Sequence, residues 1–192
     1  MLATEVIVQL HQKVTTESDA VSFSQLYVAF LPMLLQFSQS IIKNKELSEE
    51  IVSDVFIRVW ERRAQLHSIV NFKLYLYVST KNTSLNYLKR HFRKNVISIS
   101  DMDIELSSIT YTPEQILVSS ELVNKINNAI ALLPTRCKLI FKLAKEDGFK
   151  YNEIAQLLNI SVKTIDNQMS IAIKKIAATI NFDLEKKSIN NF

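Results

Sequence analysis

Apolar residues recur at intervals of three and four positions along most of the chain, which is the spacing of an amphipathic helix. Residues 19–43 show this pattern over nearly their whole length, from Phe23 to Ile41. The chain has one glycine and three prolines, so few residues interrupt the helical pattern. Pro32 lies inside this first long segment and predicts a kink or a break near Leu31. The sequence therefore predicts an all-α protein.

The segment 48–60 is predicted to be a helix with two different faces. Ser48 is expected to cap its start, because a serine side chain can accept a hydrogen bond from a backbone N–H of the first turn. One face is an apolar stripe that we expect to be buried. The other face combines charged groups with one isoleucine, which suggests a contact surface. Its residues include Glu50, Asp54, Ile57 and Arg58.

A further helix is predicted in FKLYLYVSTKNTSLNYLKRHFRKN, residues 72–95, where lysines and arginines alternate with aromatic rings. Basic groups attract phosphates, and aromatic faces stack on unpaired bases. Single-stranded nucleic acid is therefore a candidate ligand of this helix. The alternative interpretation is that most of these rings belong to the core.

Residues 96–112 lose the helical pattern, are rich in serine and threonine, and contain acidic residues but no basic one. The spacing of the acidic residues resembles a calcium-binding loop, but the glycine and glutamate that such a loop needs are missing. We therefore expect a flexible acidic linker, with Pro113 at the first position of the next helix. The predicted organisation is two helical domains, 1–95 and 113–192.

The stretch YNEIAQLLNISVKTIDNQMSIAIKKI, residues 151–176, is predicted to form a short helix, a tight turn and a longer helix. Asn159 is suited to the left-handed turn conformation, and Ser161 is expected to cap the second helix. This arrangement is a helix-turn-helix, although a plain helical hairpin is the alternative. The second helix is expected to bury Ile165, Met169, Ala172, Ile173 and Ile176. It directs Lys163, Thr164, Asn167, Gln168 and Ile171 outward, and the amides among them suit base edges in the major groove.

The charge distribution supports two regions that face polyanions. The 192 residues have a net charge of +4, but residues 58–94 hold 9 basic groups and 1 acidic group. Residues 125–192 hold 11 basic and 6 acidic groups, whereas residues 95–124 between them hold 5 acidic groups and no basic one. Solvated surface charge alone is the alternative explanation.

Several function classes are not expected. The single cysteine, Cys137, lies at helical spacing with apolar residues, which favours a buried thiol and fits a reducing cytoplasm. The three histidines are scattered and offer no metal-ligand spacing, so we expect no metal site. No cluster of residues supports an enzyme, and no cofactor is expected. No stretch is expected to approach the length and hydrophobicity of a membrane span, so membrane insertion is not expected, and the apolar run at the N-terminus is too short for a signal peptide.

With these segments in place, the chain resembles an extracytoplasmic-function sigma factor, the two-domain class of the sigma-70 family. SEEIVSDVFIRVW resembles the region 2 helix that grips RNA polymerase, and NFKLYLYVSTKNTSLNYLKR resembles the part that melts and reads the −10 element. The stretch from LPTRCK to IAIKKI resembles region 4, which reads the −35 element. The sequence departs from the family at three positions. Ser53 stands where Gln is usual, Lys150 where Ser or Thr is usual, and Asn159 where Gly is usual.

The resemblance implies a protein of the bacterial cytoplasm whose partners are core RNA polymerase, promoter DNA and an anti-sigma factor. It implies polymerase binding by Glu50, Asp54, Ile57 and Arg58. It implies −10 binding by Asn71, Lys73, Lys81, Asn82, Lys89, Arg90 and Arg93, and −35 binding by Lys163, Thr164, Asn167, Gln168 and Ile171. The alternative is a helix-turn-helix regulator that binds duplex DNA independently of polymerase.

Overall fold

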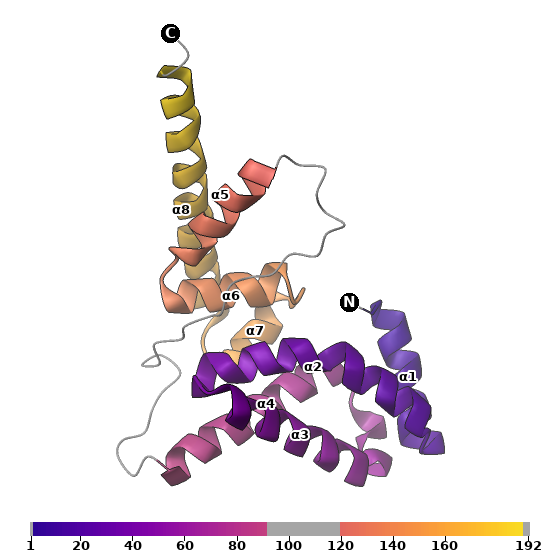
Figure 1. Ribbon diagram of the computed structural model, residues 1–192. Coiled ribbons are helices and arrows are strands. Elements are labelled where there is room, and N and C mark those ends of the chain that lie inside the picture. The colour runs from indigo at the N-terminus through magenta and orange to yellow at the C-terminus, as the bar shows by residue number, and fades with distance from the viewer. Residues whose placement is uncertain (1, 92–119, 190–192) are drawn as a thin grey trace. The chain divides into compact units, whose positions relative to one another are not determined.

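The computed structural model describes residues 2–91 and 120–189, with side chains described in 2–91 and 124–179 (Figure 1). The chain divides into two compact units, 1–102 and 103–192. Every element in the described ranges is helical, which confirms the predicted all-α class. The elements are α1 (Thr4–Glu17), α2 (Ala20–Ile42), α3 (Lys45–Glu61), the 3-10 helix η1 (Arg63–Ser68), α4 (Phe72–His91), α5 (Ser120–Ala131), α6 (Thr135–Lys145), α7 (Tyr151–Leu158) and α8 (Val162–Ile189).

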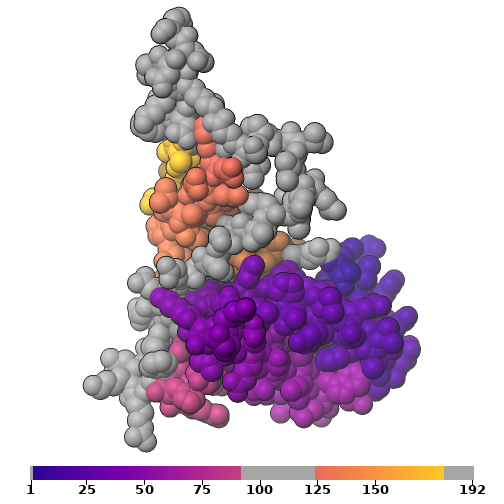
Figure 2. Space-filling model, viewed as in Figure 1, coloured from indigo at the N-terminus to yellow at the C-terminus, as the bar shows by residue number. Residues whose placement is uncertain are grey.

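In the first unit, α2 packs against α1, α3 and α4, and its apolar face forms the centre of the core. Leu26, Phe30 and Leu34 lie on one stripe of α2 and are almost completely buried. Close approach to α4 is possible because small side chains meet there: the hydroxyls of Ser38 and Ser84, both fully buried, lie 3.2 Å apart. Side chains of α2 and α3 cover most of the face of this unit that Figure 2 shows.

The helix α2 is continuous through Pro32, so of the predicted kink or break near Leu31 the break is wrong. A proline removes one backbone N–H and leaves the carbonyl four residues earlier, here that of Val28, without its helical partner. Pro32 and Val28 are both exposed, and Val28 is 66% accessible. Water can therefore satisfy the freed carbonyl, and packing of the opposite face holds the helix together.

The length and composition of α2 also contradict the expectation that no stretch approaches a membrane span. An 18-residue window of this helix has a mean hydropathy of 1.4, which meets the requirement for crossing a membrane. The core helix of a water-soluble domain meets the same requirement. The stripe that includes Phe30 packs against α3 and α4, so the buried part of this helix belongs to the core of the first unit.

The first helix, α1, packs on η1 and on the start of α4. The rings of His11 and Phe72 stack with centroids 4.4 Å apart. At the turn after α1, Ser18 Oγ accepts a hydrogen bond of 2.9 Å from Arg63 Nε. The same guanidinium lies 4.4 Å above the ring of Trp60. Contacts from α1 and its turn thus hold the segment between α3 and α4 in place.

In the second unit, α5, α6 and α7 each pack against α8. A core cluster of Ile130, Leu133, Cys137 and Ala172 joins three of these helices. Cys137 is 1% exposed, and burial raises the pKa of its thiol, as expected for a structural cysteine.

Some predictions fall outside the residues that the structure describes. These are the linker at 96–112, Pro113 and Arg93. The bounds of the two predicted domains, 1–95 and 113–192, fall there as well and stay predictions.

Candidate functional site

The helix α3 begins one turn earlier than predicted. Asn44 is its capping residue, because Asn44 Oδ1 accepts a hydrogen bond of 2.8 Å from the backbone N–H of Leu47. Ser48 lies inside the helix, where its buried hydroxyl donates to the carbonyl of Asn44 at 2.7 Å. The prediction that Ser48 caps this helix is therefore wrong, and the extra turn adds exposed charges before the predicted contact face.

The predicted contact face of α3 is solvent-exposed. Glu50, Asp54, Ile57 and Arg58 follow one stripe of the helix, and all four are exposed. Ile57 is 55% accessible, although the apolar residues around it in the sequence, Val55, Phe56 and Val59, are buried. On this face, one apolar side chain that is surrounded by charged side chains is available to a binding partner.

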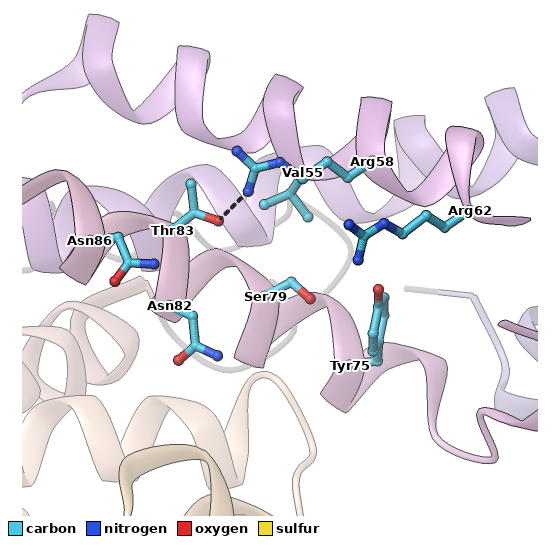
Figure 3. A pocket seen from close by; sticks show the side chains of 8 residues that line it. All are labelled: Val55, Arg58, Arg62, Tyr75, Ser79, Asn82, Thr83 and Asn86. Atoms are coloured by element: carbon cyan, nitrogen blue, oxygen red, sulfur yellow. Dashed lines mark hydrogen bonds between the residues drawn. The ribbon is translucent and has the colours of Figure 1, made fainter. Parts of the chain in front are cut away.

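Arg58 joins this face to α4. Its guanidinium lies 3.6 Å from the carboxylate of Asp54 in an ion pair between two half-exposed side chains. It also donates a hydrogen bond of 3.2 Å to the hydroxyl of Thr83 on α4 (Figure 3). Arg58, which is predicted to bind polymerase, is therefore linked by a side-chain hydrogen bond to the helix predicted to bind −10 DNA.

The predicted −10 residues occupy different environments. Asn71 caps α4, since its side-chain oxygen accepts a bond of 2.9 Å from the N–H of Leu74. Lys73 and Lys81 are half-buried, and burial lowers the pKa of Lys81. Asn82, Lys89 and Arg90 are exposed. The structure brings Asn82 close to the residues of α3, whereas Lys89 and Arg90 lie in the last turn of α4.

The rings of α4 divide between core and surface. Phe72 and Tyr77 are buried, and Tyr77 packs against Phe37 with ring centroids 5.0 Å apart. Tyr75 and Tyr87 are half-buried. The core interpretation is thus correct for Phe72 and Tyr77, and the other two rings are accessible in part.

A pocket of about 220 Å³ lies between α3 and α4 (Figure 3). Each helix contributes one stripe of side chains to it, at helical spacing. Arg58 and Asn82 are among the predicted site residues, but their neighbours one turn away, Arg62 and Asn86, are not. The spacing of four from Arg58 to Arg62, and from Asn82 to Asn86, is a signal that could have found them. The lining residues are Val55, Arg58, Arg62, Tyr75, Ser79, Asn82, Thr83 and Asn86.

The helix-turn-helix is confirmed in the second unit. Asn159 ends α7 in the left-handed conformation, with φ 55° and ψ 50°. Ser161 caps α8, because its hydroxyl accepts a bond of 3.0 Å from the N–H of Thr164. At the start of α7, the carboxylate of Glu153 accepts a bond of 2.7 Å from the N–H of Lys150. This bond satisfies a free backbone donor although Lys150 replaces the usual capping residue.

The predicted −35 face lies on the solvent side of α8. Lys163, Asn167 and Ile171 are exposed, and Thr164 and Gln168 are half-buried. Cys137 supports this helix from α6, since its thiol donates to the backbone carbonyl of Gln168 at 3.1 Å. The structure therefore brings all five predicted residues to one accessible surface.

The prediction that Ile173 is buried in α8 is wrong, because 54% of it is accessible. The buried residues Ile165, Met169 and Ala172 repeat at intervals of four and three, which continues to the half-buried Ile176. Ile173 lies one position away from that stripe and points away from the core.

Within the described residues, no group of three His, Cys, Asp or Glu side chains is placed to hold a metal ion.

Two family models match the two units. The model described as Sigma-70 region 2 matches residues 26–94, which include α3 and α4. The model described as Sigma-70, region 4 matches residues 124–176, which include the helix-turn-helix. Together the two matches cover more than half of the chain. The sigma-70 family is not a family of catalytic enzymes.

Relatives and a solved structure agree with this match. The ECF RNA polymerase sigma-E factor of Escherichia coli is 24% identical over 176 residues, which cover 88% of this chain and 89% of that protein. A Xanthomonas campestris protein named "Probable RNA polymerase sigma factor RfaY" is 23% identical over 154 residues. That match covers 79% of this chain but only 38% of the longer Xanthomonas protein.

The fold is that of a solved sigma factor. The structure of RpoE in complex with the anti-sigma factor NepR from Bartonella quintana has a TM-score of 0.53 at 20% identity. The alignment covers 84% of this chain and 98% of that one. The ordered pair of region 2 and region 4, on the helices described above, leads to one conclusion: this chain belongs to the sigma-70 family, as a sigma factor of the extracytoplasmic-function class.

Proposed function

We propose that this sigma factor binds core RNA polymerase through the exposed face of α3 and selects promoters with α4 and α8. Binding to polymerase and direction of transcription initiation are the work of a sigma factor. One observation carries the residue assignment. Each unit presents an accessible polar surface on a helix that lies within the residues matching region 2 or region 4.

The polymerase-binding face is proposed to comprise Glu50, Asp54 and Ile57, with Arg58 at its border with α4. An apolar side chain ringed by charges fits the common arrangement of an interface, in which a central anchor is desolvated and the charged rim sets orientation. Ile57 is the exposed apolar anchor of this face. The acidic residues beside it favour a basic surface on the polymerase.

The −10 surface is proposed to run along α4, with Lys73, Lys81, Asn82, Lys89, Arg90 and Arg93 as its DNA-binding residues. Asn71 acts there by capping the helix. Cationic side chains bind the backbone of a single strand, and the half-buried Tyr75 and Tyr87 offer ring surfaces to its bases. The −35 surface is proposed to be Lys163, Thr164, Asn167, Gln168 and Ile171 on α8, where Asn and Gln amides pair with base edges in duplex DNA.

We further propose that the protein acts in the bacterial cytoplasm by binding alone, without a cofactor or a catalytic step. Relatives of this family act on RNA polymerase in that compartment. The solved RpoE structure contains the anti-sigma factor NepR. By analogy, an anti-sigma factor is proposed to bind this chain and to compete with polymerase.

The test is run-off transcription with core RNA polymerase, together with equilibrium binding to core enzyme. The expected result is polymerase binding at submicromolar concentration and transcripts from selected promoters only when both components are present. Tight binding of duplex DNA by the protein alone, with no binding to core enzyme, would instead support the regulator that the sequence left as an alternative. Neither unit should bind duplex DNA tightly by itself. When both units are tethered to polymerase, the effective concentration of each at a promoter rises, and promoter binding should become tight.

A further inference from the structure

The pocket between α3 and α4 has the chemistry of an anion site. Two guanidinium groups line it: Arg58 lies in the last turn of α3, and Arg62 is the residue that directly follows this helix (Figure 3). Tyr75, Asn82 and Asn86 line it from α4, and the hydroxyl of Tyr75 points toward Arg62. No carboxylate is among the described residues that line the pocket. Arginine guanidiniums bind phosphate oxygens through paired N–H groups, so the lining favours a phosphate.

The size of the pocket limits the kind of phosphate. Sites for complete small-molecule ligands usually have a volume of roughly 300–1,000 Å³. The volume here is about 220 Å³, and the pocket is open to the surface of the first unit. It therefore suits one phosphate group with part of its sugar, as in a strand that passes over the surface. A free nucleotide cofactor would be only partly enclosed.

The bonds that hold Arg58 are weak enough to be exchanged. The ion pair with Asp54 has a separation of 3.6 Å, and each side chain is about half accessible. Exposed ion pairs of this kind contribute little to stability because water screens them. A phosphate that enters the pocket can therefore replace the carboxylate of Asp54 as the partner of Arg58. Arg62 is exposed and forms no ion pair with any residue that the structure describes.

We infer that this pocket binds one phosphodiester of single-stranded promoter DNA through Arg58 and Arg62, and that Asp54 competes with that phosphate for Arg58. The inference rests on the proposed function, because it takes the strand from the −10 region. It moves Arg58 from the polymerase contacts to the DNA contacts. It also gives Asp54 a second role: a partner that engages Asp54 releases Arg58 for the strand. Polymerase binding and strand capture are thereby coupled through one side chain.

The helix α3 contains a matched control. Lys45 and Glu49 form another exposed ion pair of the same i, i+4 type, at 3.9 Å, in the first turns of the same helix. Neither residue lines the pocket. The variants Lys45→Gln and Glu49→Gln therefore change the net charge by the same amounts as Arg58→Gln and Asp54→Asn. Any difference between the two sets reports the pocket and not the overall charge.

The experiment measures binding of the full chain to a fluorescein-labelled single-stranded oligothymidine by anisotropy at several salt concentrations. Arg58→Gln and Arg62→Gln should each weaken binding about tenfold, the loss expected for a hydrogen bond to a charged group. Each should also reduce the salt dependence, log Kd against log salt concentration, by about 0.7 for the lost phosphate contact. Asp54→Asn should strengthen binding more than Glu49→Gln does. Unchanged thermal unfolding curves will show that all variants are folded.

The inference is overturned if Arg58→Gln and Arg62→Gln bind the oligonucleotide as well as Lys45→Gln does. It is also overturned if sodium phosphate alone raises the unfolding temperature of the wild type, and not of Arg62→Gln, while both bind the oligonucleotide equally. That pattern would assign the pocket to a free anion. Run-off transcription separates the two proposals. If the wild type supports transcription but the pocket variants bind the oligonucleotide as their controls do, the proposed function stands and the phosphate site is refuted. If the variants show the predicted binding pattern but the wild type does not support core-dependent transcription, the site stands and the proposed function is refuted.

Discussion

Replacement of Ile57 by alanine tests the polymerase-binding face most directly. The side chain is accessible on α3 and belongs to no buried cluster of the first unit, so Ile57→Ala should leave folding almost unchanged. In the complex with core enzyme the same side chain is expected to be covered. The variant therefore separates binding from stability.

The magnitude follows from the exposed surface. Complete burial of an isoleucine side chain contributes about 1.5–3 kcal/mol. Because 55% of Ile57 is exposed in the free protein, a partner can cover a little over half of this surface, which corresponds to about 0.8–1.6 kcal/mol. Alanine keeps one carbon of the side chain, so we expect a loss of about 1 kcal/mol, or a Kd about fivefold higher.

The assay is equilibrium titration of the labelled protein with core RNA polymerase. Val8→Ala is the matched control, since Val8 is an aliphatic residue with 52% exposure on α1, outside the residues that match region 2. Its Kd should remain that of the wild type. A Kd for Ile57→Ala within twofold of the wild type, or an equal loss in Val8→Ala, would show that this face does not bind polymerase.

Further predictions concern DNA reading, capping and pH. Alanine at Asn167 or Gln168 should relax preference at one position of the −35 element, costing about 1–3 kcal/mol for the preferred base in competition binding of the holoenzyme. Asn82→Ala should slow promoter opening, and its transcription defect should shrink on a pre-melted template while that of Asn167→Ala persists; equal responses would refute the division of work between α4 and α8. Ser161→Ala should destabilise the second unit by about 0.5–2 kcal/mol in thermal unfolding, through loss of the cap of α8. Burial lowers the pKa of His11 below its usual 6.5, so the unfolded chain binds the proton more readily and stability should fall as pH drops below about 6.5, until the folded pKa is passed; His11→Phe should flatten this profile.

The helix-turn-helix could be predicted from the sequence because its determinants are local. A left-handed Asn159 and a capping Ser161 lie within three residues, and each acts on backbone groups next to it. Apolar spacing then identifies the buried side of α8. The limit of that pattern is Ile173, which neighbours the stripe in sequence but projects from the helix in another direction.

The start of α3 shows where local signals are ambiguous. Asn44 and Ser48 are both good capping residues, and they lie one turn apart on the same helix face. Packing decides between them. Ser48 is fully buried and its hydroxyl donates a hydrogen bond to the carbonyl of Asn44, so Asn44 is the residue that caps the helix. The periodicity of apolar residues in the sequence does not show which of these two side chains is buried.

The pocket could not be predicted for a related reason. The sequence identifies the stripe of α3 that carries Arg58 and the stripe of α4 that carries Asn82, but not that the two stripes face each other. That depends on how the helices cross, which the packing of both on α2 determines. The hydrogen bond from Arg58 to Thr83, 25 residues apart, is a product of this crossing.

The contacts that α1 makes with η1 and Phe72 affect how the −10 reading segment should be studied. The region 2 match begins at residue 26, so a fragment cut at that point would lack His11 and Ser18, which hold Phe72 and Arg63. The segment before α4 would then sample more conformations when free. DNA would have to select one of them, and the entropic cost would fall on the binding step instead of on folding. A minimal fragment defined by family similarity alone would consequently underestimate the affinity of the intact protein for its promoter.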